Sequence, residues 1–410
     1  MRTTVIGICL LLVFTSCGKD ENFTYVVPSS GEAGSITPQR LPSEETRRVL
    51  VYVSAGFNSL SNYLDENLRT LEKSTLPQGT YYSSDVLLVL ARKTVGGYST
   101  PSAPVLFRLY ADTEGNPVRD TLKVWKPEDP LCSPEVFSDA LRFIYGKFPA
   151  KGYGLLFSSH ALGWLPPNYK ASSGNDFWGV SRRSIGQDKT DTESYELSLE
   201  DFAEAIPGRL DYILFDCCLT GCVEVAWQLR GKADIVGFSP TEILAVGFDY
   251  SSLTTRLFAR EPDPVGVCQD YFAQYGPDGD ATISVVDTRK MENLASVCKT
   301  LFSKYRDALK NLSTSSVQRY FRASYTPNCT VMYDLKDMLL KAGISQEEEA
   351  ALDAALSEAI LYKDASRTFL SIDINTYSGL SVYLPSAGND VLDKYYKEHV
   401  AWNNAVELIQ

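Results

Sequence analysis

From residue 47 onward, the chain alternates short apolar runs with amphipathic segments. Residues 48–53 continue after Arg48 as an apolar run rich in β-branched valine, which is typical of a buried strand. Residues 60–73 then place apolar side chains at helical spacing. The same succession recurs further along. It predicts strands at 86–90, 105–110, 122–125, 153–157, 212–215 and 235–238, and helices at 133–148, 199–206 and 221–230. This order of strands and helices predicts an α/β fold with a mostly parallel sheet flanked by helices.

The pattern becomes mainly helical from about residue 251. The spacing of apolar residues there predicts helices at 264–276, 288–311 and 345–361, and strands at 282–286, 368–373 and 379–384. We therefore divide the folded part into residues 47–260, which hold most of the sheet, and an α-rich C-terminal region, residues 261–410, which completes the same domain.

The N-terminus has the pattern of an export signal. A basic start precedes an apolar stretch, residues 3–14, that is too short to span a membrane. It closes with Phe-Thr-Ser-Cys17, which resembles a bacterial lipobox, in which Cys17 is lipidated and becomes the mature N-terminus. An ordinary cleaved signal is the alternative. We predict a lipoprotein signal peptide at residues 1–17 and a flexible tether, rich in Ser, Pro and Gly, at residues 18–46.

The residues after Cys17 bear on localisation. Gly18-Lys-Asp-Glu-Asn22 resembles the acidic patch that sends some lipoproteins of the Bacteroides type to the cell surface. We therefore expect an exported chain, an outer-membrane or cell-surface lipoprotein that contacts the membrane through its lipid anchor alone.

Composition and charge narrow the range of partners. Apolar residues make up 44% of the chain and charged residues 22%, as in an ordinary globular protein. With 51 acidic and 39 basic residues the net charge is -12, and the charges are spread without long blocks. Because such a chain repels phosphate backbones, we expect no nucleic acid among its partners.

One of the two histidines in the chain lies just beyond a predicted strand. His160 follows the apolar run 153–157, and the run 212–215 leads into Asp216, Cys217 and Cys218. Neighbouring strand tips would deliver the imidazole and a thiol to the same edge of the sheet. A nearby base favours the thiolate, so the pattern predicts a cysteine nucleophile.

The remaining cysteines fit packing better than metal binding. Of nine cysteines, two belong to the leader, and the remaining seven are an odd number, which leaves at least one thiol outside any disulfide. Because side chains alternate along a strand, Cys217 and Cys218 face opposite sides, and we expect Cys217 and Cys222 to pack in the core. Two such cysteines cannot easily share one tetrahedral ion with His160, and no Cys-x-x-Cys pair occurs. We predict no metal and no other cofactor; a thiol redox protein is disfavoured for the same reason.

Two segments carry a resemblance to a known family. Leu155-Leu-Phe-Ser-Ser-His-Ala-Leu-Gly-Trp164 and Phe215-Asp-Cys-Cys-Leu-Thr-Gly-Cys-Val-Glu-Val-Ala226 resemble the histidine and cysteine motifs of the clostripain-like cysteine peptidases. The likeness extends over residues 47–410. It implies a caspase-like fold and a cysteine endopeptidase that acts on peptide or protein substrates.

The resemblance also implies roles for individual residues. Cys218 takes the place of the nucleophile and His160 that of the general base and acid. Main-chain N–H groups, of Ala161 and of Cys218, would hold the oxyanion. Asp216 would bind an Arg or Lys side chain before the cut bond.

At three places the chain departs from the family pattern. Ala161 stands where the family usually has glycine, Leu162 replaces a small residue, and Val246 stands where a second pocket acid is common. Glu242 and Asp249 are the nearby acids that could take over. These departures keep an alternative open: a catalytically impaired homologue that binds peptide, protein or glycan at the cell surface.

A long irregular segment separates the two motifs. Residues 165–195 lack a sustained period and hold four basic residues. They are Lys170, Arg182, Arg183 and Lys189. Because loops of this length beside a site are often functional, and relatives cut themselves in this region, we predict self-processing within 165–195. An exposed basic loop without a processing role is the alternative.

Overall fold

A computed structural model of the chain describes residues 46–79, 85–92, 94–95, 100–167, 184–189, 194–322 and 331–410. Residues 42–410 form one compact unit. Within its described residues, nine strands form one sheet in the order β14-β12-β11-β10-β7-β1-β2-β5-β6. The five central strands from β11 to β2 run parallel, and the two strands at each edge pair in antiparallel fashion. The mostly parallel α/β sheet is therefore confirmed, with antiparallel borders.

The strands of the large sheet are β1 (Arg48–Ala55), β2 (Asp85–Arg92), β5 (Val105–Ala111), β6 (Pro117–Val124), β7 (Gly152–Ser158), β10 (Leu210–Asp216), β11 (Ala233–Phe238), β12 (Thr282–Asp287) and β14 (Ile360–Ala365). Four two-stranded sheets accompany it. They are built from β3 (Thr94–Val95) with β4 (Thr100–Pro101), β8 (Ile185–Lys189) with β9 (Ser194–Leu197), β13 (Met332–Asp334) with β17 (Ser381–Tyr383), and β15 (Thr368–Phe369) with β16 (Ile372–Asp373).

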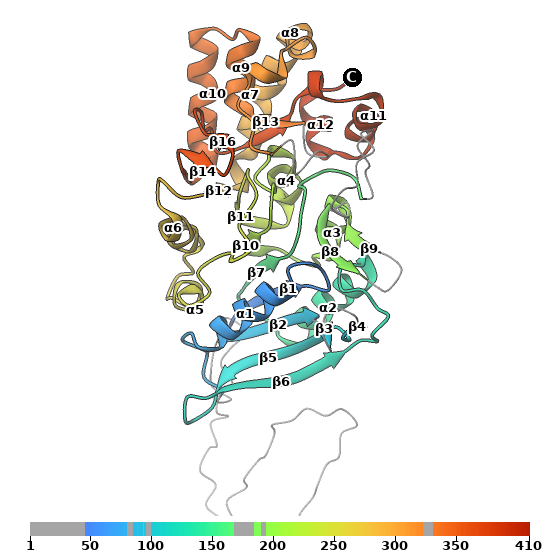
Figure 1. Ribbon diagram of the computed structural model, residues 1–410, viewed down its shortest axis with the longest axis vertical. Coiled ribbons are helices and arrows are strands. Elements are labelled where there is room, and N and C mark those ends of the chain that lie inside the picture. The colour runs from blue at the N-terminus through green and yellow to red at the C-terminus, as the bar shows by residue number, and fades with distance from the viewer. Residues whose placement is uncertain are drawn as a thin grey trace, which may run out of the picture. The chain divides into compact units, whose positions relative to one another are not determined.

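The helices are α1 (Ser61–Glu72), α2 (Pro134–Lys147), α3 (Leu199–Ala205), α4 (Val223–Gln228), α5 (Leu253–Leu257), α6 (Pro264–Tyr275), α7 (Met291–Lys304), α8 (Arg306–Lys310), α9 (Leu335–Ala342), α10 (Gln346–Ala359), α11 (Asp390–His399) and α12 (Ala401–Val406). In the described part of the chain, none has the combination of length and apolarity that crossing a membrane requires. Figure 1 shows α7, α9 and α10 gathered beyond the β14 edge of the sheet.

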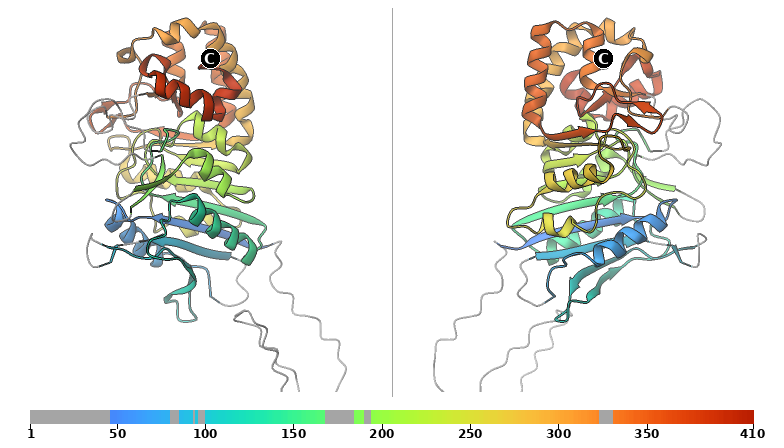
Figure 2. Two further views of the ribbon diagram at one scale, coloured as in Figure 1. Left: turned by 90° about the vertical axis from the view of Figure 1, so that its right-hand side faces the viewer. Right: turned by 60° about the vertical axis from the view of Figure 1, so that its left-hand side comes forward.

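Two hydrophobic cores cover the two faces of the sheet. One face packs against α1, α5 and α6, and the other packs against α2, α3, α4 and the C-terminal helices. Figure 2 shows these layers from two further sides. Because both faces are covered, the central parallel strands are apolar throughout, as the unbroken runs in the sequence indicate.

Local signals fix several helix ends. The Ser133 side chain accepts a hydrogen bond from the N–H of Val136, so α2 begins where the sequence places a cap followed by Pro134. Ser345 and Glu348 form a reciprocal capping box at the start of α10. These contacts satisfy N–H groups that the first helical turn leaves without intrahelical partners.

Three expectations about secondary structure were wrong. The helix expected at 345–361 ends at Ala359, because Ile360 continues into β14, which pairs with β12. The strand expected at 368–373 is a tight hairpin that turns at Leu370, where φ is 50°. Part of the segment 165–195, expected as an irregular loop, forms the β8–β9 hairpin.

Candidate active site

The ends of β7 and β10 lie side by side at the carboxyl edge of the parallel strands. Their pairing ends at Ser158 opposite Asp216, and the N–H of Ser159 still donates to the Asp216 carbonyl at 3.4 Å. His160 and Cys218 each follow two residues after the last pair. The register therefore brings the two residues to corresponding positions beyond neighbouring strands, as expected from the sequence.

His160 is largely buried and is contacted by the segment that follows β1. Its Nε2 lies 2.8 Å from the hydroxyl of Ser59, and 9% of the residue is exposed. The neighbouring Asn58 is anchored through its side-chain amide, which donates to the carbonyls of Ala55 and Gln187 at 3.0 and 2.7 Å. Ser59 did not stand out in the sequence, although it follows a third parallel strand that ends at the same edge.

The turn that carries Cys218 has unusual backbone geometry. Leu219, which is fully buried, adopts a φ of 58°, and its N–H donates to the carbonyl of Thr241 at 2.8 Å. The Cys218 thiol lies 3.7 Å from the carbonyl of Ile243. Left-handed backbone at a non-glycine residue costs about 1–3 kcal/mol and is common at functional sites. The strain coincides with the position directly after the candidate nucleophile.

The adjacent cysteine points the other way. Cys217 is 1% exposed, and its thiol lies 3.3 Å from the carbonyl of Phe157 inside the core. Cys222 is fully buried at the start of α4. The expectation that Cys217 and Cys222 are packing residues is confirmed. The six described cysteines form no disulfide with one another.

The segment after His160 is fastened on two sides. Ala161 faces Ile185 in an isolated bridge, in which the N–H of Leu162 donates to the carbonyl of Ser184 at 2.9 Å. On the other side lies Gly163, with a φ of 65°; a Cβ there would stand 2.7 Å from the carbonyl oxygen of Leu219. The segments that follow the two candidate catalytic residues therefore touch each other through their backbones.

The β8 strand is held to the main sheet by a buried ion pair. Arg92 at the end of β2 contacts Asp188 at 2.6 Å, and both side chains are fully buried. The carboxylate of Asp188 also accepts from the N–H of Leu131, and the N–H of Lys189 donates to the carbonyl of Phe57 at 3.1 Å. A buried pair of this kind is strongly destabilising to break, so β8 is a fixed part of the site.

Asp216 lies inside the protein and is 6% exposed. Its Oδ2 accepts hydrogen bonds from the hydroxyls of Tyr250 at 2.6 Å and Ser158 at 2.9 Å. Burial raises the pKa of Asp216 to about 6, although these hydrogen bonds and one from the N–H of Phe248 favour the charged form. Gly247, with a φ of 72°, packs directly against this carboxylate. A Cβ atom added at Gly247 would lie 2.4 Å from Oδ2.

The acids near Val246 are already engaged within the protein. Val246 itself is 58% exposed. Glu242 forms an ion pair with Arg322, whose Nε donates to Oε1 of Glu242 at 3.0 Å. Asp249 accepts a hydrogen bond from the N–H of Ser251 at 3.0 Å. Asp216 and Asp249 therefore have only hydroxyl and main-chain donors around them, whereas Glu242 is paired with a guanidinium group.

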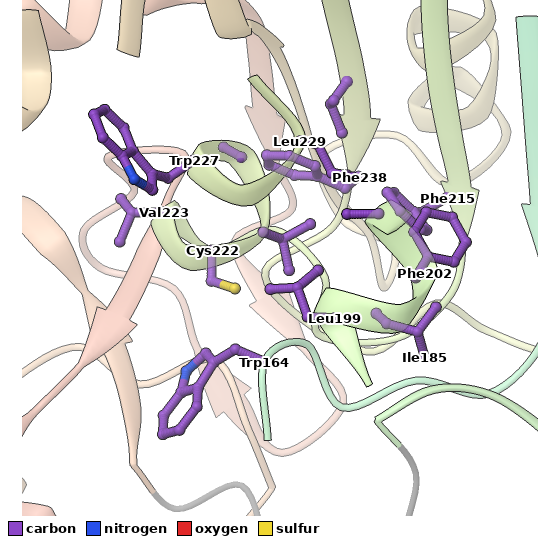
Figure 3. Close-up of a cluster of buried hydrophobic side chains, with 14 of the residues drawn as sticks. Trp164, Ile185, Leu199, Phe202, Phe215, Cys222, Val223, Trp227, Leu229 and Phe238 are labelled. Atoms are coloured by element: carbon purple, nitrogen blue, oxygen red, sulfur yellow. The ribbon is translucent and has the colours of Figure 1, made fainter. Parts of the chain in front are cut away.

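A second buried carboxyl, that of Glu224, lies in α4, the helix that follows the turn with Cys218. Oε1 of Glu224 in α4 accepts from the N–H of Tyr383 at 2.9 Å and from the hydroxyl of Tyr396 at 2.8 Å. The Trp164 ring packs on both tyrosine rings. Figure 3 shows Trp164 and Cys222 in the same hydrophobic cluster. This cluster joins the segment after His160 to the C-terminal region.

Other candidates are less well defined. In the described part of the chain, no group of three His, Cys, Asp or Glu side chains could hold a metal ion. Of the four basic residues in the segment 165–195, Lys189 lies in β8. The other three, and Cys17, are outside the described residues. His399 is exposed at the end of α11, where it faces Glu200 at 3.6 Å.

The sequence as a whole decides the family. Residues 51–408 match the model of the clostripain family. The chain belongs to the clostripain family. The chain is similar to an inactive zymogen C11 protease from Parabacteroides distasonis, whose X-ray structure is known. The two sequences are 29% identical over 90% of this chain and 99% of that one, and the structures superpose with a TM-score of 0.72.

A second solved structure gives the same result. It is a secreted C11 cysteine protease from Bacteroides thetaiotaomicron in complex with an irreversible peptide inhibitor, at 25% identity over 88% of this chain and 99% of that one, with a TM-score of 0.71. No curated protein matches the chain. The caspase-like fold is thus confirmed, and the clostripain-family chain is a clostripain-like cysteine peptidase, a hydrolase.

Proposed function

We propose that Cys218 is the nucleophile of this peptidase and that His160 is its general base and acid. The thiolate attacks the carbonyl carbon of a peptide bond, and the C–N bond then breaks as the imidazolium gives its proton to the leaving amine. Water hydrolyses the thioester and restores the thiol. The observation that carries this proposal is the register that ends at Ser158 and Asp216, two residues before each of these side chains.

Ser59 supports the role of His160. In the tautomer with a proton on Nε2, the imidazole donates to the Ser59 hydroxyl, and Nδ1 carries the lone pair that accepts a proton. A hydroxyl from the loop after β1 would then orient the ring. Ser59 is in this view a positioning residue rather than a catalytic one.

The oxyanion would be held by the main-chain N–H groups of Ala161 and Cys218. The bridge to β8 uses the N–H of Leu162, so it does not consume that of Ala161. The buried ion pair of Arg92 with Asp188 keeps β8, and with it this segment, in one position. Preorganised donors of this kind contribute strongly to catalysis.

For specificity, we propose cleavage after Arg or Lys with Asp216 as the acceptor. Asp216 is the acid two residues before Cys218, and no guanidinium or ammonium group of the described residues hydrogen-bonds to it. The charged form is disfavoured by burial in the substrate-free protein, and a bound cation would reverse this effect.

Self-processing would take place within the segment 165–195. Lys189 is a poor site, since its N–H is bonded to Phe57 and its strand is anchored by Asp188. Arg182 and Arg183 are the better candidates. The relative from Parabacteroides distasonis is an inactive zymogen, which supports a processing step in this family.

Export as a lipoprotein anchored through Cys17 completes the proposal. One relative is a secreted protease, which supports export of this chain. The lipobox-like sequence that ends at Cys17 supports the anchor.

A binding protein without turnover is the second candidate. Ala161 in the place of the usual glycine favours it, because alanine restricts the backbone where the oxyanion donor stands. The burial of Asp216 also favours it, since a substrate cation would have to reach a carboxylate that is 6% exposed.

The deciding experiment compares the full chain with its Cys218→Ala variant on a peptide library varied at the residue before the cut bond. Cleavage after Arg or Lys that is lost in the variant is the expected result. Cleavage after other residues would keep the nucleophile and remove the role of Asp216. Without any cleavage, even after the 165–195 segment is nicked, the binding protein becomes the better interpretation.

A further inference from the structure

Two tyrosine hydroxyls near Asp216 are buried and have no hydrogen-bond partner among the described residues. They belong to Tyr271 and Tyr275 on α6, one helical turn apart. A buried hydroxyl without a partner is destabilising, and such groups are uncommon in folded proteins. Two such hydroxyls on one helix make this region a candidate for binding a polar group.

The charge of Asp216 acts on both phenols. Burial raises the pKa of Tyr271 well above its ordinary value, and Tyr275, Asp216 and Cys218 raise it further. Burial and the charge of Asp216 raise the pKa of Tyr275 to about 12. Asp216 therefore acts on both phenols, and Cys218 acts on that of Tyr271.

Ring packing connects the two tyrosines to the loop beside Asp216. The ring centroids of Tyr271 and Tyr275 are 5.3 Å apart, and the Tyr271 ring lies 5.0 Å from that of Phe248. The N–H of Phe248 donates to Asp216, and the preceding Gly247 approaches the same carboxylate. The loop that holds the exposed Val246 therefore packs against Tyr271 and approaches Asp216.

We propose that Tyr271 and Tyr275 join Asp216 at the end of the pocket for the residue before the cut bond, and that this pocket prefers lysine to arginine. The proposal rests on the proposed peptidase function. The side chain would enter past Val246 and place its terminal nitrogen among one carboxylate and two phenol oxygens. The phenols take over the polar contact that a second acid provides in relatives.

The preference for lysine follows from the geometry of the donors. A guanidinium binds best when its planar fork meets two free carboxylate oxygens. Here Oδ2 of Asp216 already accepts from Tyr250 and Ser158. An ammonium group is a compact donor of three hydrogen bonds, which suits three separate acceptors.

The test measures binding rather than turnover. The affinity of the full chain with Cys218→Ala is measured for three peptides that differ only in lysine, arginine or norleucine before the scissile bond. Tyr271→Phe and Tyr275→Phe are then added singly to this background, with Tyr63→Phe, an exposed tyrosine, as the matched control. Thermal unfolding of each variant shows whether it is folded.

We expect lysine to bind about tenfold or more tightly than norleucine, and more tightly than arginine. Each of the two phenylalanine variants should weaken lysine binding by about tenfold, leave norleucine unchanged, and unfold at the same or a higher temperature. Equal affinity for lysine and norleucine, tighter binding of arginine, or unchanged lysine affinity in both variants would overturn the proposal.

Cleavage by the wild-type chain is measured separately. Absence of cleavage with lysine-selective binding would reject the proposed turnover and leave the pocket in place. Cleavage after other residues without lysine-selective binding would reject the pocket alone.

Discussion

Replacing Glu224 by glutamine should stabilise the protein at neutral pH and make its stability less dependent on pH. Burial raises the pKa of Glu224 from 4.5 to about 7, although Tyr383 and Tyr396 donate to the charged form. Below the unfolded value of 4.5, both states are protonated and the carboxyl costs nothing. As the pH rises, the unfolded chain releases this proton first, so stability falls until the folded carboxyl ionises near pH 7.

The size of the effect follows from the same values. A rise in pKa from 4.5 to about 7 lowers the free energy of unfolding by about 3 kcal/mol above pH 7. Glutamine keeps an oxygen for Tyr383 and Tyr396 and cannot ionise. The variant should therefore gain up to about 3 kcal/mol over the wild type at about pH 8, and little or nothing at about pH 4.5.

The free energy of unfolding of both proteins is measured with urea across this pH range. Asp216 and the other buried acids are the same in both proteins, so the difference between the two free energies reports on Glu224. Glu128→Gln, an exposed site, controls for the loss of one negative charge. If the two curves ran parallel from acid to neutral pH, Glu224 would ionise without penalty and the reasoning would be wrong.

Three further predictions concern activity. In the wild type, kcat/KM for a basic substrate divided by kcat/KM for a norleucine substrate should fall as the pH drops through about 6, because Asp216 then becomes neutral. In Asp216→Asn this ratio should not depend on pH. Ser59→Ala should lower kcat by about tenfold or less without changing the thermal midpoint, since His160 loses one orienting hydrogen bond; Ser313→Ala, on the surface, is its control. Gly163→Ala should lower kcat/KM by about a hundredfold, because its Cβ would press on the Leu219 carbonyl, and unchanged kinetics would refute that contact.

The sequence predicted best what depends on local pattern. The buried strand runs, the Ser133 cap and the placement of His160 and Cys218 after neighbouring strands follow from periodicity and strand direction. The helix expected to reach residue 361 ends at Ala359, because pairing with β12 overrides a continuing apolar period.

Contacts between distant segments could not be predicted in this way. The partners Arg92 and Asp188 are separated by 96 residues, and neither stands out locally. Asp188 lies in a stretch that has no periodic pattern, yet its buried ion pair helps to turn that stretch into a strand. Tyr271 appears as an ordinary apolar position of a helix, and only the fold shows that its hydroxyl lacks a partner.

The way β7 and β10 share the sheet has a consequence for a chain cut between them. A break in residues 168–183 would leave β1, β2, β5, β6 and β7 on one fragment and β10, β11, β12 and β14 on the other, yet the pairing of β7 with β10 would still cross the divide. The ion pair of Arg92 with Asp188 would join the same two fragments. Each fragment alone would expose an unpaired central strand, which favours aggregation. The nicked enzyme should therefore travel as one particle in size-exclusion chromatography, and its halves should be unable to exchange with those of other molecules without global unfolding.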